Sequence, residues 1–157
     1  MVARGTPTGT MLKNGYQSLV AFTENATLGV WEKEVTPPGL DSGDKIDITT
    51  MHNATYKTFV HQALVEVTDA GMTCAYDPGQ LSALVTLLTA AASTNQLISY
   101  HYPDGSSWDV YGFLKSFTPE TLSNGAHPQA TVTIVHTNLD NSSPPAEIAP
   151  AYNAPSP

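Results

Sequence analysis

Two β-rich runs joined by a tight turn decide the fold, and they stand at residues 96–117, QLISYHYPDGSSWDVYGFLKSF. The turn sequence Pro103–Ser106 between them predicts a β-hairpin. Strict alternation in its second strand, 107–117, separates two sets of large apolar residues, with Trp108, Val110 and Leu114 on one face and Tyr111, Phe113 and Phe117 on the other. We therefore expect one face to join the core and the other to meet a neighbouring subunit.

Further β-rich runs predict a mainly β domain over residues 15–137, of a sandwich or barrel-like kind. The other strands are expected at 16–23, 28–35, 63–67, 72–76 and 129–137. The first two read as a hairpin, and the next two flank a turn at 69–71. Residues 1–14 are predicted to form a flexible arm and residues 138–157 a mobile tail, because neither has a hydrophobic period.

One helix is expected to flank the sheet, over residues 78–92. Asp77 can accept from the amide of Gln80, Gln80 can reach back, and Pro78 fits the first helical position. The apolar stripe is expected to consist of Leu81, Leu84, Val85, Leu88, Ala91 and Ala92. The other face carries Ser82, Thr86, Thr89 and Ser93, without charge. Such a face is either merely exposed or covered by another subunit.

Residues 40–62 are predicted to form a long loop. Only 45–49 alternates, with Ile46 and Ile48 on one face and Asp47 and Thr49 on the other. A connection this long is uncommon in a compact domain unless it has a function. We expect it to need a partner.

Composition and charge restrict the function. A chain of 157 residues, 41% apolar, fits one domain. Its net charge of −8 disfavours gripping nucleic acid. Only 13% of residues are charged, against about 25% in a typical domain, which indicates either a Thr-rich β protein or a covered surface. No window reaches the roughly 18–20 apolar residues of a membrane span, and without a secretory signal we expect synthesis in a cytosol-like compartment.

No pattern commits the chain to catalysis, and we expect no enzyme activity and no cofactor. The five histidines, His52, His61, His101, His127 and His136, lack metal-ligand spacing. The single cysteine, Cys74, excludes an internal disulfide and lacks a nucleophile signature, so we expect a packed thiol. Residues 39–45 match neither a phosphate loop nor a calcium loop.

The order of features along the chain is more informative than any single motif. The segments are PGLDSGDKIDITT (38–50), VTDAGMT (67–73), YDP (76–78), YPDGS (102–106), YGFLKSF (111–117) and a final TVTI strand. This order, over about residues 16–137, resembles the major tail tube proteins of long, non-contractile-tailed bacteriophages.

The resemblance implies a tail-tube-like fold in which six copies close into a ring and stacked rings conduct genomic DNA during ejection. It implies a virion location after synthesis in the host bacterial cytoplasm, and as partners the chain itself and the tape measure, tail tip and terminator proteins. The 40–62 loop, with the 1–14 arm, would reach the next ring. Candidate acids for a negative channel wall are Asp41, Asp44, Asp47, Glu66, Asp69, Asp104 and Asp109. Such a wall would let DNA slide without adhesion.

Candidate contacts between subunits are Ser82, Thr86, Thr89, Tyr111, Phe113 and Phe117. Other functions stay open. One is a tube or ring protein of a contractile tail or secretion machine. A monomeric β-sandwich binding module would not explain the long loop or the charge deficit. A small hydrolase would lack an acid/base constellation.

Overall fold

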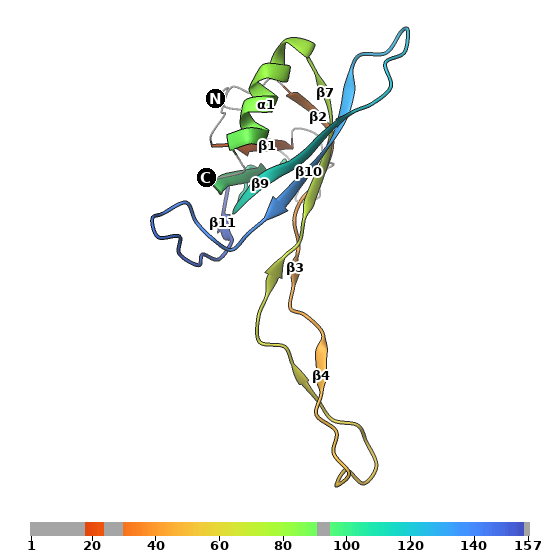
Figure 1. The fold of residues 1–157 in the computed structure, drawn as a ribbon, viewed down its shortest axis with the longest axis vertical. Coiled ribbons are helices and arrows are strands. Elements are labelled where there is room, and N and C mark those ends of the chain that lie inside the picture. The colour runs from red at the N-terminus through yellow and green to blue at the C-terminus, as the bar shows by residue number, and fades with distance from the viewer. Residues whose placement is uncertain (1–17, 24–29, 91–94, 156–157) are drawn as a thin grey trace.

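The computed structural model describes residues 18–23, 30–90 and 95–155. A seven-stranded antiparallel sheet forms the body, with the strand order β1-β8-β9-β10-β7-β2 and β11 pairing with β9 (Figure 1). The strands are β1 (Leu19–Phe22), β2 (Val30–Thr36), β7 (Ala70–Tyr76), β8 (Gln96–His101), β9 (Ser107–Pro119), β10 (Gln129–His136) and β11 (Ala151–Asn153). The expectation of a mainly β fold with one flanking helix is confirmed.

The predicted 96–117 hairpin is confirmed as β8 and β9, which pair from Gln96 opposite Gly112 to His101 opposite Ser107. The face assigned to Phe117 was wrong. Thr133 of β10 lies opposite Ser116 and Ile134 lies opposite Leu114, so Lys115 is an extra residue in β9. This β-bulge reverses the alternation beyond it. Phe117 therefore packs on the core, with its ring centroid 5.2 Å from that of Tyr76.

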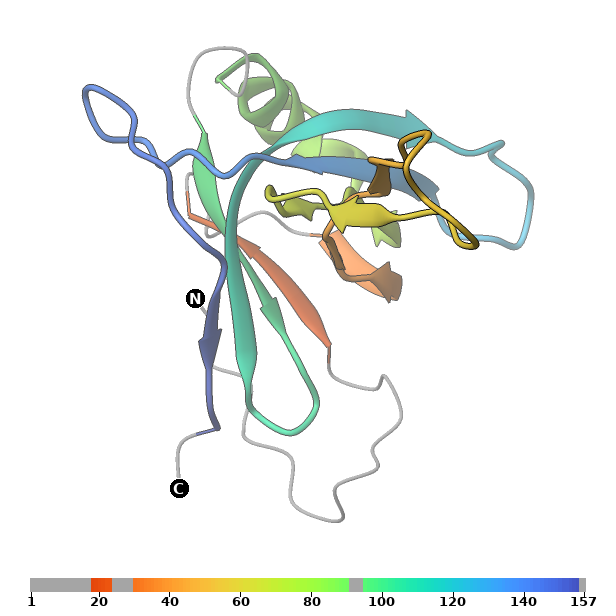
Figure 2. The same cartoon turned by 90° about the horizontal axis from the view of Figure 1, so that it is seen from below.

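The predicted hairpin of 16–23 with 28–35 is wrong in its pairing. Both strands form, but β1 pairs with β8 and β2 pairs with β7, so they occupy opposite ends of the strand order. The sheet curls strongly, as Figure 2 shows from below, and brings these ends near one another. The backbone amide of Val20 donates to Glu32 Oε1 at 3.1 Å. A side-chain contact thus joins two strands that chain proximity alone suggested would pair directly.

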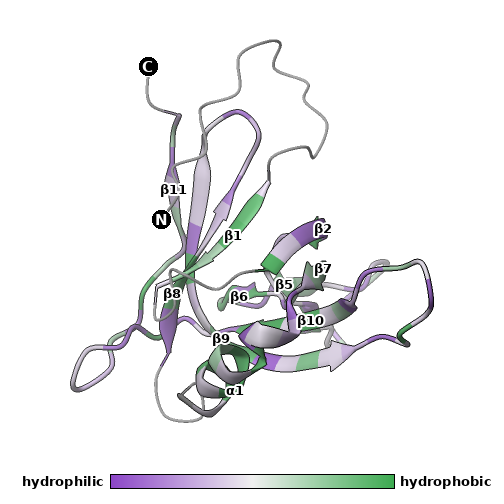
Figure 3. Ribbon diagram, turned by 90° about the horizontal axis from the view of Figure 1, so that it is seen from above, coloured by the Kyte–Doolittle hydropathy of each residue, from purple (hydrophilic) through white to green (hydrophobic). Residues whose placement is uncertain are grey.

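The core lies on the side of the sheet covered by the helix. Burial alternates strictly along β7, from Ala70 to Tyr76. The main cluster consists of Val20, Phe22, Ala70, Met72, Cys74, Tyr76, Leu87, Ile98, Tyr100, Leu114, Ala130, Val132 and Ile134. Figure 3 shows hydrophobic residues along β1 and on α1, the helix of the body. Of the expected core face of β9, Val110 and Leu114 are buried and Trp108 packs against the cluster.

The predicted helix appears as a 3-10 turn, η1 (Pro78–Gln80), followed by α1 (Leu81–Ala90); residues 91–92 lie outside the described residues. Asp77 caps it, but its carboxylate accepts from the amide of Gly79 at 2.9 Å rather than from that of Gln80. The Gln80 amide instead donates to the backbone oxygen of Asp77 at 2.8 Å. The 3-10 geometry of this first turn moves the capping contact by one residue.

The apolar stripe of α1 was predicted in part wrongly. Leu84 and Leu87 are buried and Leu88 is partly buried against the core, whereas Leu81 and Val85 are exposed. Each residue advances about 100° around a helix, so a stripe centred on positions 84, 87 and 88 leaves position 85 roughly a quarter turn away. Which leucines are buried therefore depends on how the helix packs on the sheet, and the helix pattern alone does not predict it.

Residues 40–67 form a long β-ribbon, not the loop expected for 40–62. Its strands are β3 (Leu40–Asp41), β4 (Lys45–Asp47), β5 (Phe59–His61) and β6 (Glu66–Val67), with β3 pairing with β6 and β4 with β5. The ribbon projects far from the body (Figure 1). At its base, the amide of Gly39 donates to Thr68 Oγ1 at 2.8 Å. The turn expected at 69–71 is absent, because β7 begins at Ala70 and runs straight on from the ribbon.

The end of the chain carries more regular structure than its composition indicates. Leu139 and Glu147 form an isolated bridge, and Ala151–Asn153 form β11, which pairs with β9 from Asp109 to Ser107. Asp140 Oδ1 accepts from the amides of Ser142 and Ala146 at 3.0 and 2.8 Å. The predicted 1–14 arm lies outside the described residues.

Candidate interaction surfaces

Residues 40–66 of the ribbon are called the arm from here on, and they are distinct from the N-terminal arm predicted for residues 1–14. This arm has no core of its own. Every arm residue is exposed except Asn53, which is partly buried. Its exposed large apolar side chains are Leu40, Ile46, Ile48, Met51, Tyr56, Phe59, Val60, Leu64 and Val65. Monomeric proteins rarely expose so many large apolar groups together, and such groups mark contact sites.

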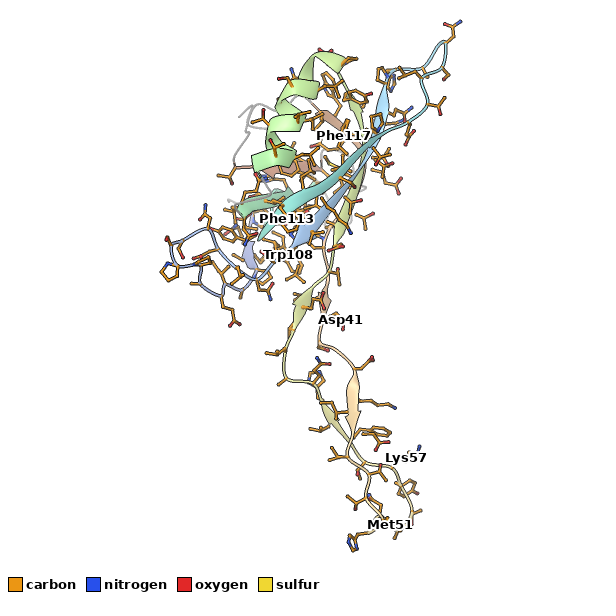
Figure 4. All side chains as sticks on the ribbon, in the orientation of Figure 1. Asp41, Met51, Lys57, Trp108, Phe113 and Phe117 are labelled. Atoms are coloured by element: carbon orange, nitrogen blue, oxygen red, sulfur yellow. The ribbon has the colours of Figure 1, made fainter. Side chains whose placement is uncertain are left out.

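The tip of the arm is organised by the side chain of Asn53. Its Oδ1 accepts from the amide of Thr50 at 2.8 Å, and its Nδ2 donates to Tyr56 O at 3.2 Å and to Thr58 Oγ1 at 3.3 Å. Met51 is fully exposed on this tip (Figure 4). The hydrogen bonds hold a defined shape without any packing beneath it.

The two faces of the arm differ. Ile46 lies opposite Val60, and the amide of Ile48 donates to Thr58 O at 3.0 Å, so alternation puts Ile46, Ile48 and Val60 on one face. The opposite face carries Lys45, whose Nζ lies 4.1 Å from the ring centroid of Phe59. One face is aliphatic and has no such contact, whereas on the other face the ammonium of Lys45 contacts the ring of Phe59.

The outer side of the sheet presents a second apolar area. Tyr111 lies opposite Leu97 of β8, and Phe113 lies opposite Val135 of β10; all four are partly buried. We call Leu97, Tyr111, Phe113 and Val135 the outer patch. Two of the predicted contact residues, Tyr111 and Phe113, lie in it, but Phe117 belongs to the core side. The alternation of 107–117 revealed this patch, while the bulge at Lys115 had no sequence signal.

The predicted helix face, Ser82, Thr86 and Thr89, is exposed. Its threonine hydroxyls are satisfied within the helix: Thr86 Oγ1 donates to Ser82 O at 3.0 Å, and Thr89 Oγ1 donates to Val85 O at 2.8 Å. Val85 beside them is 58% exposed. The face is thus more apolar than its sequence indicated, since the hydroxyls do not need an outside partner.

The seven candidate acids do not gather on one surface. Asp41, Asp44, Asp47 and Glu66 lie on the arm, and Asp69 lies at its base between β6 and β7. Asp104 lies in the β8–β9 turn and Asp109 lies in β9. The first four share the arm with its exposed apolar residues, and the last two lie on the body.

Four of these acids have local structural partners. Asp41 Oδ1 accepts from the amide of Gly43 at 2.8 Å. Asp47 Oδ1 accepts from the amide of Thr49 at 2.8 Å, and hydrogen bonds from Thr49 lower the pKa of this carboxyl. Asp104 Oδ1 accepts from the amide and hydroxyl of Ser106 at 2.9 and 2.6 Å. Asn153 Nδ2 donates to Asp109 Oδ2 at 2.7 Å, which ties β11 to β9.

No group of three or more His, Cys, Asp or Glu among the described residues is placed to hold a metal ion. Cys74 is fully buried, and burial, with smaller contributions from Glu32 and Glu120, raises the pKa of its thiol to about 11. That environment disfavours the reactive thiolate. In the same part of the chain, no helix is long and apolar enough to cross a membrane.

A buried polar pair lies inside the body. Tyr100 of β8 and His136 of β10 are joined across β9 by a hydrogen bond of 2.9 Å between Tyr100 Oη and His136 Nε2. Gly112 of β9 lies beneath the imidazole, where a Cβ would come within 2.8 Å of His136 Nδ1. Burial lowers the pKa of His136 and raises that of Tyr100. Both groups are therefore held neutral, which suits a structural contact.

Comparisons with known proteins identify the fold. No protein-family model and no curated protein sequence match the chain. A solved chain described as "Virion of native gene transfer agent (GTA) particle" is similar, with a TM-score of 0.60 and 8% identity over 91% of this chain and 100% of that one. A chain of the "anti-feeding prophage (AFP) baseplate, 6-fold symmetrised" is similar at a TM-score of 0.54 and 8% identity, over 76% of this chain and 87% of that one. The fold is thus one found in assembled, phage-like particles.

Proposed function

We propose that this chain is a structural subunit of a phage-like tail, six copies of which close into a ring that stacks with others into a tube. The observation that carries the proposal is the arm, an ordered ribbon of exposed apolar residues on a fold found in two such particles. A ribbon with no core lowers its free energy by burying those residues against another subunit. One similar chain comes from a six-fold symmetrised baseplate, which is consistent with a six-membered ring.

Neighbours within a ring would meet through the body. The outer patch around Tyr111 and Phe113 and the helix face of Ser82, Thr86 and Thr89 are its uncovered, weakly charged surfaces. The arm, with residues 1–14, would contact the next ring. Tape measure, tail tip and terminator proteins would be the other partners in the virion tail.

The acidic balance suits a channel for DNA. With a net charge of −8, a ring of such subunits repels the phosphate backbone, so genomic DNA can pass without being held. Asp104 and Asp109 on the body, with Asp69 and the arm acids, are the candidates for the wall.

A tube or ring component of a contractile tail or secretion machine is a second candidate, favoured by the similarity to a baseplate chain. A monomeric binding module fits less well, because it leaves the apolar arm exposed to water.

Electron microscopy of the purified protein, and of particles from its source, tests the proposal. We expect rings or tubes at high protein concentration near physiological salt. Particles that lack the chain, together with a protein that scatters light only as a monomer even in the presence of a tail initiator complex, would contradict it.

Hydrogen exchange gives a second test. Amides of residues 40–62 should exchange more slowly after assembly than in the isolated subunit, because assembly covers the arm. Equal exchange in both states would remove the arm from the interface.

A further inference from the structure

The aliphatic face of the arm is a preformed contact surface. Ile46 and Ile48 are 51% and 52% exposed, and Val60, opposite Ile46, is 46% exposed. No other part of the described chain covers them. Their β-branched side chains are stiff, so little side-chain entropy is lost when a partner covers them.

Charge on the arm is distributed unlike charge on the body. The distal arm, residues 45–61, carries Lys45, Lys57 and Asp47, a net charge of +1. The described body, residues 18–23, 30–39, 67–90 and 95–155, carries nine Asp and Glu residues and two Lys, a net charge of −7. A second copy of the chain would therefore attract the distal arm and repel another body.

We propose that the distal arm docks on the acidic body of a second copy of this chain through the face formed by Ile46, Ile48 and Val60, while Lys45 and Lys57 of the same ribbon supply its net positive charge. The inference rests on the proposed function, and it adds which face of the arm makes the contact and which charges orient it. Burial of the aliphatic face supplies affinity, and the positive charge of the two lysines supplies attraction that salt weakens.

The opposite face is the matched reference. Phe59 is comparably exposed, at 42%, but its ring is already in contact with the Lys45 ammonium, 4.1 Å from the ring centroid. Phe59 and Ile46 lie on neighbouring residue pairs of one ribbon, so the two faces experience the same backbone. Any difference between their variants reports on the docking face rather than on the ribbon.

The test compares the full chain with the triple variant Ile46→Thr, Ile48→Thr, Val60→Thr and the control Phe59→Thr, all of which keep good strand formers. Sedimentation velocity over a concentration series measures the dissociation constant for self-association, and micrographs of the same samples record rings or tubes. We expect the triple variant to weaken association about tenfold or more, and the control less than about threefold. The thermal unfolding temperatures of the wild-type, triple-variant and control monomers should coincide, because the arm lies outside the core.

The dependence of association on salt provides an independent test. Salt screens the repulsion between acidic bodies in both chains, so the informative quantity is the difference between them: raising ionic strength should weaken association of the wild-type chain more than that of the variant Lys45→Gln, Lys57→Gln. The inference is overturned if the triple variant associates like the wild type, or if Phe59→Thr weakens association as much. Rings formed equally by all variants would overturn the inference and still support the proposed function. Association that depends on the arm but yields no rings or tubes would support the inference and contradict the proposed function. Binding of DNA by the arm instead of protein would overturn the inference.

Discussion

The body and the arm use the same β signals with opposite outcomes. In the body, alternating strands such as β7 bury every second side chain beneath the helix and the rest of the sheet. In the arm, Ile46 and Ile48 alternate just as cleanly and stay exposed. A ribbon of two strands has no second layer, so pairing alone fills its hydrogen bonds but leaves its apolar face in water. Alternation therefore indicates a strand, and only the tertiary structure tells what that strand faces.

The largest contrast should appear between two isoleucines. Ile98 is fully buried in the body, and Ile98→Ala should lower the free energy of unfolding by about 2–5 kcal/mol. Ile46→Ala in the arm should lower it by less than about 1 kcal/mol, because half of the side chain is already in water. Urea unfolding of the monomers measures both. Equal losses would mean that the arm has a core that the structure does not show.

The helix gives the next contrast. Leu87→Ala should cost about 2–4 kcal/mol, whereas Val85→Ala should cost less than about 1 kcal/mol, because Leu87 is buried and Val85 exposed. Chemical denaturation is again the measurement. A larger loss of stability for Val85→Ala than for Leu87→Ala would mean that Val85 belongs to the buried stripe, as the sequence indicates.

A pair of strand glycines tests packing within the sheet. A Cβ at Gly112 would lie 2.3 Å from Val135 O and 2.8 Å from His136 Nδ1, so Gly112→Ala should cost about 1–3 kcal/mol. At Gly71 the nearest atom is Val132 O at 3.8 Å, and Gly71→Ala should change stability by less than about 1 kcal/mol. Similar values for both would show that β10 moves away at little cost.

His136 should make the body sensitive to acid. Burial lowers its folded pKa below the unfolded value near 6.5, so the unfolded chain binds the proton first as pH falls. Stability is thus fully present above about pH 6.5 and declines below it. His136→Gln should show a smaller decline in urea unfolding between pH 7.5 and 5.5. Equal declines in both chains would assign the effect to other groups.

The smallest effect on stability is expected at the arm tip. Asn53→Ala removes the acceptor of the Thr50 amide, which should exchange faster with solvent. The free energy of unfolding of the body should change by less than about 0.5 kcal/mol, because the arm adds nothing to the core. Protection of Thr50 that persists in the variant would show that the loop backbone alone holds the tip.

Much of the fold could be predicted where one local rule was sufficient. Asp77-Pro78 marked the helix start, and Pro103–Ser106 marked the hairpin that became β8 and β9. Partner choice could not be predicted. The pairing of β1 with β8, and of β2 with β7, depends on a sheet that curls over long sequence distances. The bulge at Lys115, which moved Phe117 to the core side, follows from fitting β9 to β10 and has no local signal.

The sequence by itself determined the class of the molecule: a mainly β chain with one capped helix, few charged residues and a negative net charge, a single thiol, and an unusual segment near residues 40–62. Those properties are local or compositional, so each can be read from neighbouring residues. Tertiary structure alone decided that this segment is a ribbon projecting from the body, that Leu87 rather than Val85 is buried, and that His136 reaches Tyr100 above Gly112. Each of these depends on which surfaces remain after the sheet has curled and packed against the helix, and that is a property of the whole chain.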